Sequence, residues 1–258
     1  MNIGEEMKEE IFNEVLETFE NEDIKEFAEK CIKSAPKYFY EVPSSSTMKY
    51  HPAYACTTPL GLAKHSVALV RLLNHMFGVE SIANQFTSRE RDLLRVAGIT
   101  HDMMKSGSQE EYEHSKYTKF DHPLKAAEFV RELSTLNKEE TDLLCSVIST
   151  HMGAFNTDKR HPDIILPKPT DKYQIIVHLA DYLASRKDIE MKFDDISNDI
   201  SKVNVDPSTH VIPFGKYKGE TLGEIYNKDK GYLKWLISNI SEGQTTSMIH
   251  QLFEKENQ

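Results

Sequence analysis

The chain has 258 residues, of which 39% are hydrophobic and 28% charged, and a formal net charge of −10. This composition is ordinary for a globular protein with one large domain and an appendage. No stretch approaches the roughly 18 apolar residues that a membrane span needs, and an acidic start with Glu5 and Glu6 excludes a signal peptide. We therefore expect a cytoplasmic protein without membrane partners.

The three cysteines form no CxxC pair, and an odd number in a cytosolic chain indicates reduced structural thiols. If the protein binds a metal ion, its ligands must therefore be histidine and aspartate side chains.

Apolar residues at three-and-four spacing predict a helix over residues 5–33, with a break near residues 21–23. Residues 34–58 contain three prolines and are expected to be irregular. Thr58 and Pro59 then predict the start of a helix that runs to about residue 77, because threonine caps free amides and proline suits the first helical position. His65 lies on the apolar face of this helix.

A capping box from Thr87 to Glu90 predicts the start of a helix that ends at His101 and Asp102. Adjacent histidine and aspartate at the end of a buried helix can both reach a metal ion. The polar stretch 103–121 is expected to be a loop, long enough to cover a site.

Three more helices are predicted after this loop, at about residues 122–133, 137–153 and 170–189, with an irregular stretch over 154–170. The first begins with His122, and the second carries His151 on its apolar face. The third contains Asp181, and an aspartate inside an apolar helix is costly unless it is paired or bound to metal. His178, three residues earlier, is a candidate to support the ligands.

The sequence changes character after residue 195, which places a domain boundary near residues 200–210. Residues 211–222 predict a short strand or hairpin, and one or two helices follow around residues 232–237. The predicted division is an N-terminal helical segment, a central domain and a small C-terminal module, at residues 1–33, 34–200 and 207–258.

The order His65, His101-Asp102, His122, His151 and Asp181 resembles the HD-domain superfamily of metal-dependent phosphohydrolases. Its motif is His…His-Asp…Asp, with extra histidines in two-metal members, and Lys105 matches the family's HDxxK form. The resemblance covers roughly residues 35–195. It implies a mainly α fold, an HD-type helical bundle with a small α+β C-terminal module.

The resemblance also implies the ligands. One metal ion would be held by His65, His101, Asp102 and Asp181, and Asp102 would bridge to a second ion held by His122 and His151. Such ligands suit two divalent ions chosen from Mn, Fe, Co, Ni and Zn, and they allow Mg. Two ions would activate a water molecule for attack on phosphorus, with Asp102 and Lys105 as catalytic residues. Met152 stands where some two-metal relatives have a second histidine, which removes one ligand.

Residues 40–65, 149–153 and 178–186 resemble HD-type bacterial 3′–5′ exoribonucleases and their phage-borne relatives. This resemblance implies a bacterial or phage-infected host cell. It also makes Lys49, His51 and Arg186 candidates for binding substrate phosphates, together with Lys105.

Residues 213–219 and 232–236 resemble the C-terminal module of exodeoxyribonuclease X-like proteins. Lysines interleaved with aromatic residues favour a nucleic-acid surface, with Lys216 and Lys218 as candidate contacts. The same aromatic residues could instead form the core of the module, and both interpretations can hold together.

These resemblances predict a phosphodiesterase or exonuclease acting on a nucleotide or nucleic acid. The alternatives are a nucleotidase acting on nucleoside mono- or triphosphates, an HD-type di-iron oxygenase, and a binding protein without activity. Lys105 and the C-terminal module argue against the oxygenase, and the complete ligand set argues against an inactive binder. The oligomeric state is not predicted.

Overall fold

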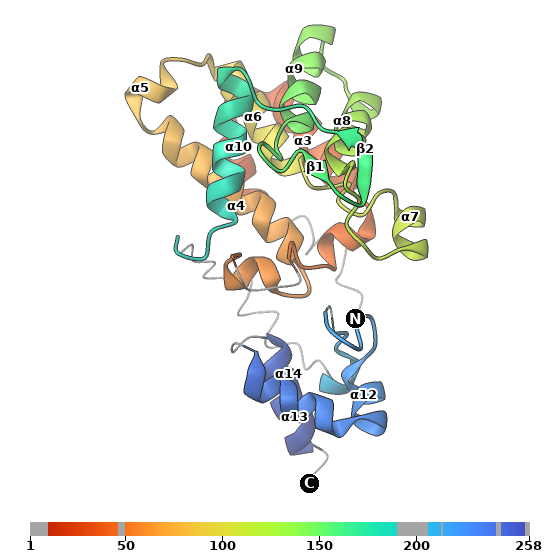
Figure 1. Ribbon diagram of the computed structural model, residues 1–258. Coiled ribbons are helices and arrows are strands. Elements are labelled where there is room, and N and C mark those ends of the chain that lie inside the picture. Colours follow the sequence, from red (N-terminus) through yellow and green to blue (C-terminus); the bar gives the residue numbers. More distant parts are fainter. Residues whose placement is uncertain (1–9, 46–49, 190–205, 213, 241–243, 256–258) are drawn as a thin grey trace.

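The computed structural model describes residues 10–45, 50–189, 206–212, 214–240 and 244–255. Their buried apolar side chains form two separate cores, one between Ile11 and Ala184 and a smaller one between Ile212 and Leu252. Figure 1 shows the corresponding helical bundle and, below it, the small C-terminal unit. The predicted fold class, mainly α with a small C-terminal module, is confirmed.

The larger core is built almost entirely from helices. These are α2 (Asn13–Leu16), α3 (Glu22–Ser34), α4 (Gly61–Phe77), α5 (Glu80–Ala83), α6 (Ser88–Thr100), α7 (Gln109–His114), α8 (His122–Leu133), α9 (Lys138–Ser149) and α10 (Lys172–Ala184). Strands β1 (Thr157–Asp158) and β2 (His161–Ile165) pair antiparallel. Short 3-10 turns occupy Lys37–Tyr40 and Ala53–Cys56.

Helix α6 is the centre of the bundle, because α3, α4, α9 and α10 all pack against it. Its start is fixed by the predicted capping box between Thr87 and Glu90. Helices α6 and α4 approach closely at Gly98, where an added Cβ would lie 2.6 Å from Cδ2 of Leu69. The missing side chain of Gly98 therefore sets how near His65 on α4 comes to the end of α6.

A buried carboxylate ties the N-terminal helices to α6. Oδ2 of Asp92 accepts hydrogen bonds from the backbone amides of Glu20 and Asn21 at 2.9 and 2.8 Å, and Oδ1 accepts one from Arg95 at 2.5 Å. These two amides precede α3. Asp92 therefore fixes the position at which the chain enters α3.

The predicted start of α4 is wrong. The helix begins at Gly61, after Leu60 in the left-handed region with φ of 72°, so Thr58 and Pro59 neither cap nor begin it. The reason is a tertiary contact: the amides of Leu60 and Leu62 donate to the carbonyls of Tyr40 and Val42. That pairing holds the chain outside the helix for two residues longer than local preference predicts.

Two stretches predicted to be irregular contain regular structure. Residues 103–121 include α7, and residues 154–170 include the hairpin of β1 and β2. The helices that carry His151 and Asp181 end earlier than predicted, at Ser149 and Ala184. The helix predicted over residues 5–33 is interrupted between α2 and α3, and its first residues lie outside the described chain.

The smaller core is formed by α12 (Leu222–Lys228), α13 (Lys230–Asn239) and α14 (Gln244–Lys255). The predicted strand or hairpin is reduced to one isolated bridge between Val211 and Thr221. The predicted limits of the domains stay predictions, since residues 190–205 lie outside the part of the chain that is described.

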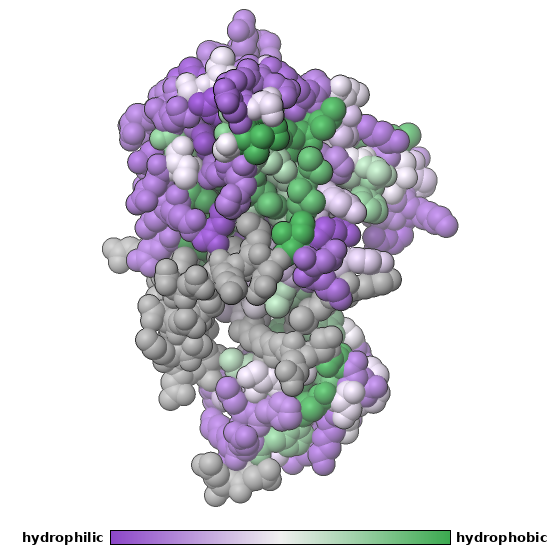
Figure 2. Space-filling view, turned by 90° about the vertical axis from the view of Figure 1, so that its left-hand side faces the viewer, coloured by the Kyte–Doolittle hydropathy of each residue, from purple (hydrophilic) through white to green (hydrophobic). Residues whose placement is uncertain are grey.

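Helix α10 is amphipathic only in part. It buries Ile176, Val177 and Ala180 and exposes Ile175 and Leu179. Figure 2 shows a hydrophobic band on the side of the bundle turned toward the viewer. Across the described ranges, none of the helices combines the length and the apolar character needed to cross a membrane.

We expect Gly98→Val to lower the free energy of unfolding by about 1–3 kcal/mol, because the new side chain would collide with Leu69. The matched control is Gly231→Val, since the nearest atom to a Cβ at exposed Gly231 lies 3.5 Å away. Urea unfolding of both variants tests this. Equal stabilities would show that α4 and α6 have room to separate.

Candidate metal centre

Six ionisable side chains from five helices meet inside the bundle. They come from α4, the end of α6, the start of α8, the second residue beyond α9, and α10: His65, His101, Asp102, His122, His151 and Asp181. The first five are at most 3% exposed, and the side chain of Asp181 is 18% exposed. All six residues predicted as metal ligands are therefore brought together.

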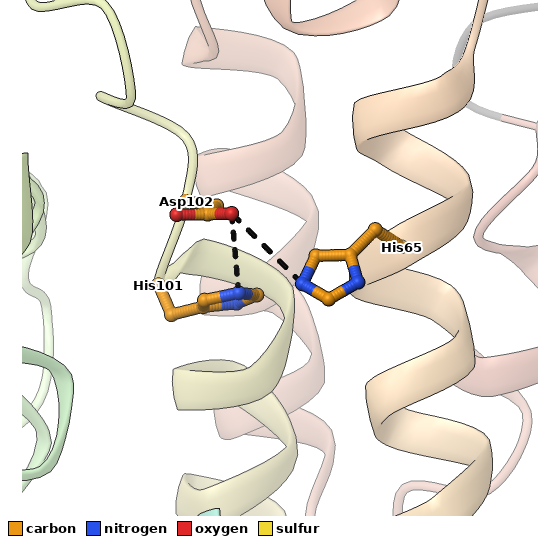
Figure 3. A group of neighbouring side chains, drawn as sticks. All are labelled: His65, His101 and Asp102. Atoms are coloured by element: carbon orange, nitrogen blue, oxygen red, sulfur yellow. Dashed lines mark ion pairs between the residues drawn. The ribbon is translucent and has the colours of Figure 1, made fainter. Parts of the chain in front are cut away.

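The carboxylate of Asp102 lies between two sets of imidazoles. Its Oδ2 is 3.5 Å from Nε2 of His101 and 3.9 Å from Nε2 of His65, and Figure 3 shows this side of the cluster. Its Oδ1 faces the other way, 3.1 Å from Nε2 of His122 and 3.7 Å from Nε2 of His151. The two oxygens of Asp102 thus face different pairs of imidazoles.

Asp181 completes the first set. Its Oδ1 lies 2.9 Å from Nε2 of His65 and 3.7 Å from Nε2 of His101. Two groups of three potential ligands follow from these distances, His65 with His101 and Asp102, and Asp102 with His122 and His151. His151 also forms a third group with His101 and Asp181, so it has potential partners in both sets.

The imidazole rings are held by backbone carbonyls three residues earlier in the chain. Nδ1 of His101 lies 2.8 Å from the carbonyl oxygen of Gly98, and Nδ1 of His151 lies 2.8 Å from that of Ile148. Nδ1 of His122 lies 2.7 Å from the carbonyl oxygen of Lys119. A carbonyl only accepts, so in each ring Nδ1 carries the proton and the lone pair of Nε2 faces the cluster.

The cluster fits divalent metal ions. Nε2 of His101 is buried and has no hydrogen-bond partner among the described residues. Leaving a buried lone pair without a partner costs free energy, and a cation would remove that cost. Four imidazole nitrogens and two carboxylates are also a donor set that first-row transition metals prefer.

The pKa shifts suit metal binding. Burial, together with the neighbouring His101 and His122, lowers the pKa of His151 to about 3, and burial also lowers that of His101. Burial alone would raise the pKa of Asp102, but Lys105 and the imidazoles outweigh it and hold this pKa well below its usual range. Near neutral pH the carboxylate is therefore ionised and these imidazoles are neutral, as ligands must be.

Lys105 and His51 lie beside the cluster. Nζ of Lys105 is 2.5 Å from Oδ2 of Asp102, and the His51 ring is 6.4 Å from the His65 ring. Burial, followed by the proximity of His65 and Lys105, lowers the pKa of His51 to about 4. Lys49, also predicted to contact substrate, lies outside the described residues.

Arg186 is held at the end of α10 by aromatic rings. Its guanidinium lies 4.2 Å from the ring centre of Tyr182 and 5.7 Å from that of Tyr50, and its Nε donates to the Tyr182 carbonyl. The amide of Lys187 donates to the carbonyl of Tyr50, which fastens the two segments together. This arrangement was not predicted, since it joins residues far apart in sequence.

Two supporting contacts explain how the ligands are held. Nδ1 of His178 lies 2.7 Å from the His151 carbonyl, and its ring occupies the space that a side chain at Gly153 would fill. The hydroxyl of buried Tyr38 lies 2.7 Å from the carbonyl of Gly107 and accepts from the amide of Ser106. His178 was predicted as a supporting residue, whereas nothing in the sequence around Tyr38 indicated its role.

The pKa of His151 predicts a pH-dependent stability for the protein treated with a chelator. Between pH 6.5 and about 3 the unfolded chain binds a proton at this position and the folded chain does not. The free energy of unfolding should thus fall on acidification, by up to about 1.4 kcal/mol per pH unit from this group alone. Urea unfolding at neutral pH and at about pH 5 measures it. A His151→Gln variant should show a smaller fall, and an equal fall in both proteins would contradict the prediction.

Two regions of the chain match known families. Residues 72–186 match the HD domain, and residues 212–241 match the exodeoxyribonuclease X-like C-terminal domain. The first match begins after His65, so the place of His65 in the cluster rests on the geometry. Neither the curated proteins nor the solved structures include a match to this chain.

Proposed function

We propose, from the match of residues 72–186 to the HD domain, that this chain is a metal-dependent phosphohydrolase that cleaves phosphodiester bonds in a nucleic acid or a small oligonucleotide. The observation that carries the proposal is the position of Asp102, whose two oxygens face separate sets of imidazoles. A carboxylate shared in this way favours a pair of metal ions over a single one.

The ligands named above would hold two divalent ions, from the series Mn, Fe, Co, Ni and Zn or with Mg. Such ions would activate a water molecule and offset the negative charge that develops on the phosphoryl oxygens. The chain itself would bind and orient the phosphate. Lys105 places an ammonium group beside Asp102, where it would contact a non-bridging oxygen.

His51 and Arg186 would extend this contact surface. With a pKa of about 4, His51 is neutral near pH 7 and would offer a hydrogen bond without adding charge. Arg186 lies against Tyr182 and uses its Nε for the backbone contact. Other N–H groups of the guanidinium can donate to a phosphate oxygen. A preoriented guanidinium loses less entropy on binding than a mobile one.

The C-terminal match supports a polymeric substrate. Residues 212–241 match a domain that takes its name from an exodeoxyribonuclease, and Lys216 and Lys218 within it are exposed. A nucleotidase acting on monomers would gain little from such a module. The metal cluster by itself suits a nucleotidase or a di-iron oxygenase equally well, so substrate experiments must separate these activities.

We expect Asp102→Ala to abolish hydrolysis of bis-p-nitrophenyl phosphate with Mn²⁺, because both sets of imidazoles lose their shared carboxylate. Asp163→Ala, at an exposed position of β2, is the matched control and should remain active. Metal analysis and circular dichroism of both variants separate loss of the site from loss of the fold. Activity retained in a folded Asp102→Ala protein would refute the site.

Lys105→Met should keep its bound metal but lose about 100-fold or more in kcat, as expected when a charged group that binds the phosphate is removed. Lys138→Met, whose side chain is 88% exposed on α9, is the control. Steady-state kinetics combined with metal content measures the effect. A Lys105→Met protein with full activity would show that this ammonium only neutralises Asp102.

A screen of nucleotides, cyclic nucleotides and short oligonucleotides with each metal, followed by mass spectrometry, tests the substrate. Shortened oligonucleotides would support the proposal. Phosphate released only from mononucleotides would identify a nucleotidase, and oxygen uptake by iron-loaded protein would identify an oxygenase.

A further inference from the structure

The C-terminal module carries an exposed aromatic stack. The rings of Tyr232 and Trp235 on α13 lie 6.0 Å apart and are nearly parallel, at 19°, and the Tyr217 ring meets that of Tyr232 edge-on at 5.0 Å. Trp235 is 54% exposed. We propose that this stack binds an unpaired base of single-stranded nucleic acid, an inference that deepens the proposed function and rests on it for its biological role.

Trp235 is not needed to fill the core of the module. That core consists of buried aliphatic residues and Tyr226, and Trp235 is neither among them nor among the partly buried side chains packed against them. Burying a large aromatic side chain stabilises a folded protein, and the exposed part of the Trp235 ring does not contribute this stabilisation. Such a ring is free to cover a flat apolar partner.

Hydrogen bonds hold two of the three rings, those of Tyr217 and Tyr232, before anything binds. The hydroxyl of Tyr232 accepts a hydrogen bond from the amide of Lys216 at 3.1 Å, and the hydroxyl of Tyr217 donates to Asp229 at 2.9 Å. Gly215 has φ of 75°, and a Cβ there would lie 2.2 Å from the Tyr232 hydroxyl, so only glycine lets the ring sit in this place. A preformed platform loses little conformational entropy when a base stacks on it.

The charge around the stack fits a polyanion. Residues 211–240 contain five lysines and three acidic residues, in a chain with a net charge of −10. Asp229 pairs with Lys216, and Glu220 pairs with Lys228. The other three lysines have no carboxylate within 4.0 Å in the described ranges: Lys218, Lys230 and Lys234. These ammonium groups are available to phosphates.

Stacking decides which nucleic acid the surface fits. A base inside a duplex has both faces covered by its neighbours, whereas a single strand exposes base faces that can cover an indole ring. The phosphates of that strand can then contact the lysines. Lys218 also lies 4.2 Å from the ring centre of Tyr117, which precedes His122, so a bound strand would run near the segment that leads to the metal cluster.

Trp235 is the only tryptophan in the chain, so its fluorescence reports directly on the stack. The experiment titrates the full chain with short oligothymidine, oligouridine and a matched duplex. It uses the Asp102→Ala background without added metal, so that nothing is cleaved. We expect quenching by the single strands, with the DNA and RNA arms showing which backbone is preferred, and little quenching by the duplex. Unchanged fluorescence with both single strands would overturn the inference.

Fluorescence anisotropy of labelled oligothymidine supplies the affinities of variants. Trp235→Ala should weaken binding about 5- to 100-fold, the effect of losing one stacked base. Trp235→Phe should retain most of the affinity, and Val211→Ala, at another exposed apolar position of the module, should change nothing. Equal affinities for Trp235→Ala and the parent, in proteins with the same circular dichroism, would overturn the proposal.

The same proteins separate this inference from the proposed function. If wild-type protein hydrolyses oligonucleotides and Trp235→Ala binds and cleaves them equally well, the stack has no such role while the function stands. If the stack binds single strands but wild-type protein with metal cleaves no nucleic acid, the proposed function fails and the binding site remains.

Discussion

The structure depends on one buried charge, the carboxylate of Asp102. At 3% exposure it would be protonated or expelled if it stood alone, since removing a charge from water costs far more than a single contact returns. The ammonium group of Lys105, 2.5 Å from Oδ2, favours the ionised form. Four imidazoles surround the carboxylate. The bundle therefore has a polar centre inside an apolar core. Each surrounding helix contributes a side chain to this polar centre.

Helix ends solve the problem of placing polar ligands in that core. His101 follows the last residue of α6, His122 is the first residue of α8, and His151 lies just after α9. The last carbonyls of a helix have no partner within the helix. In α6 and α9 the rings of His101 and His151 donate to such carbonyls, at Gly98 and Ile148, so one hydrogen bond satisfies the helix end and aims the ligand.

Local sequence patterns predicted the parts of this arrangement that local physics decides. The capping box of α6, the start of α8 at His122 and all six clustered side chains followed from spacing and from the resemblance. The start of α4 did not, because the carbonyl of Tyr40 holds Leu60 out of the helix. The supporting role of Tyr38 and the rings around Arg186 also depend on long-range contacts, and a single sequence carries no signal for those.

Net charge explains why a separate binding surface would matter. A chain at −10 repels a polyanion at long range, so the ligands of the metal cluster cannot by themselves draw in a nucleic-acid strand. The positive excess of residues 211–240 offsets that repulsion locally. Salt would weaken the attraction between these lysines and the phosphates. Stacking on Trp235 does not depend on charge and would persist as salt rises. Lysines alone would hold a strand beside the acidic domain only at low salt. A surface that combines lysines with base stacking can hold the strand as salt rises.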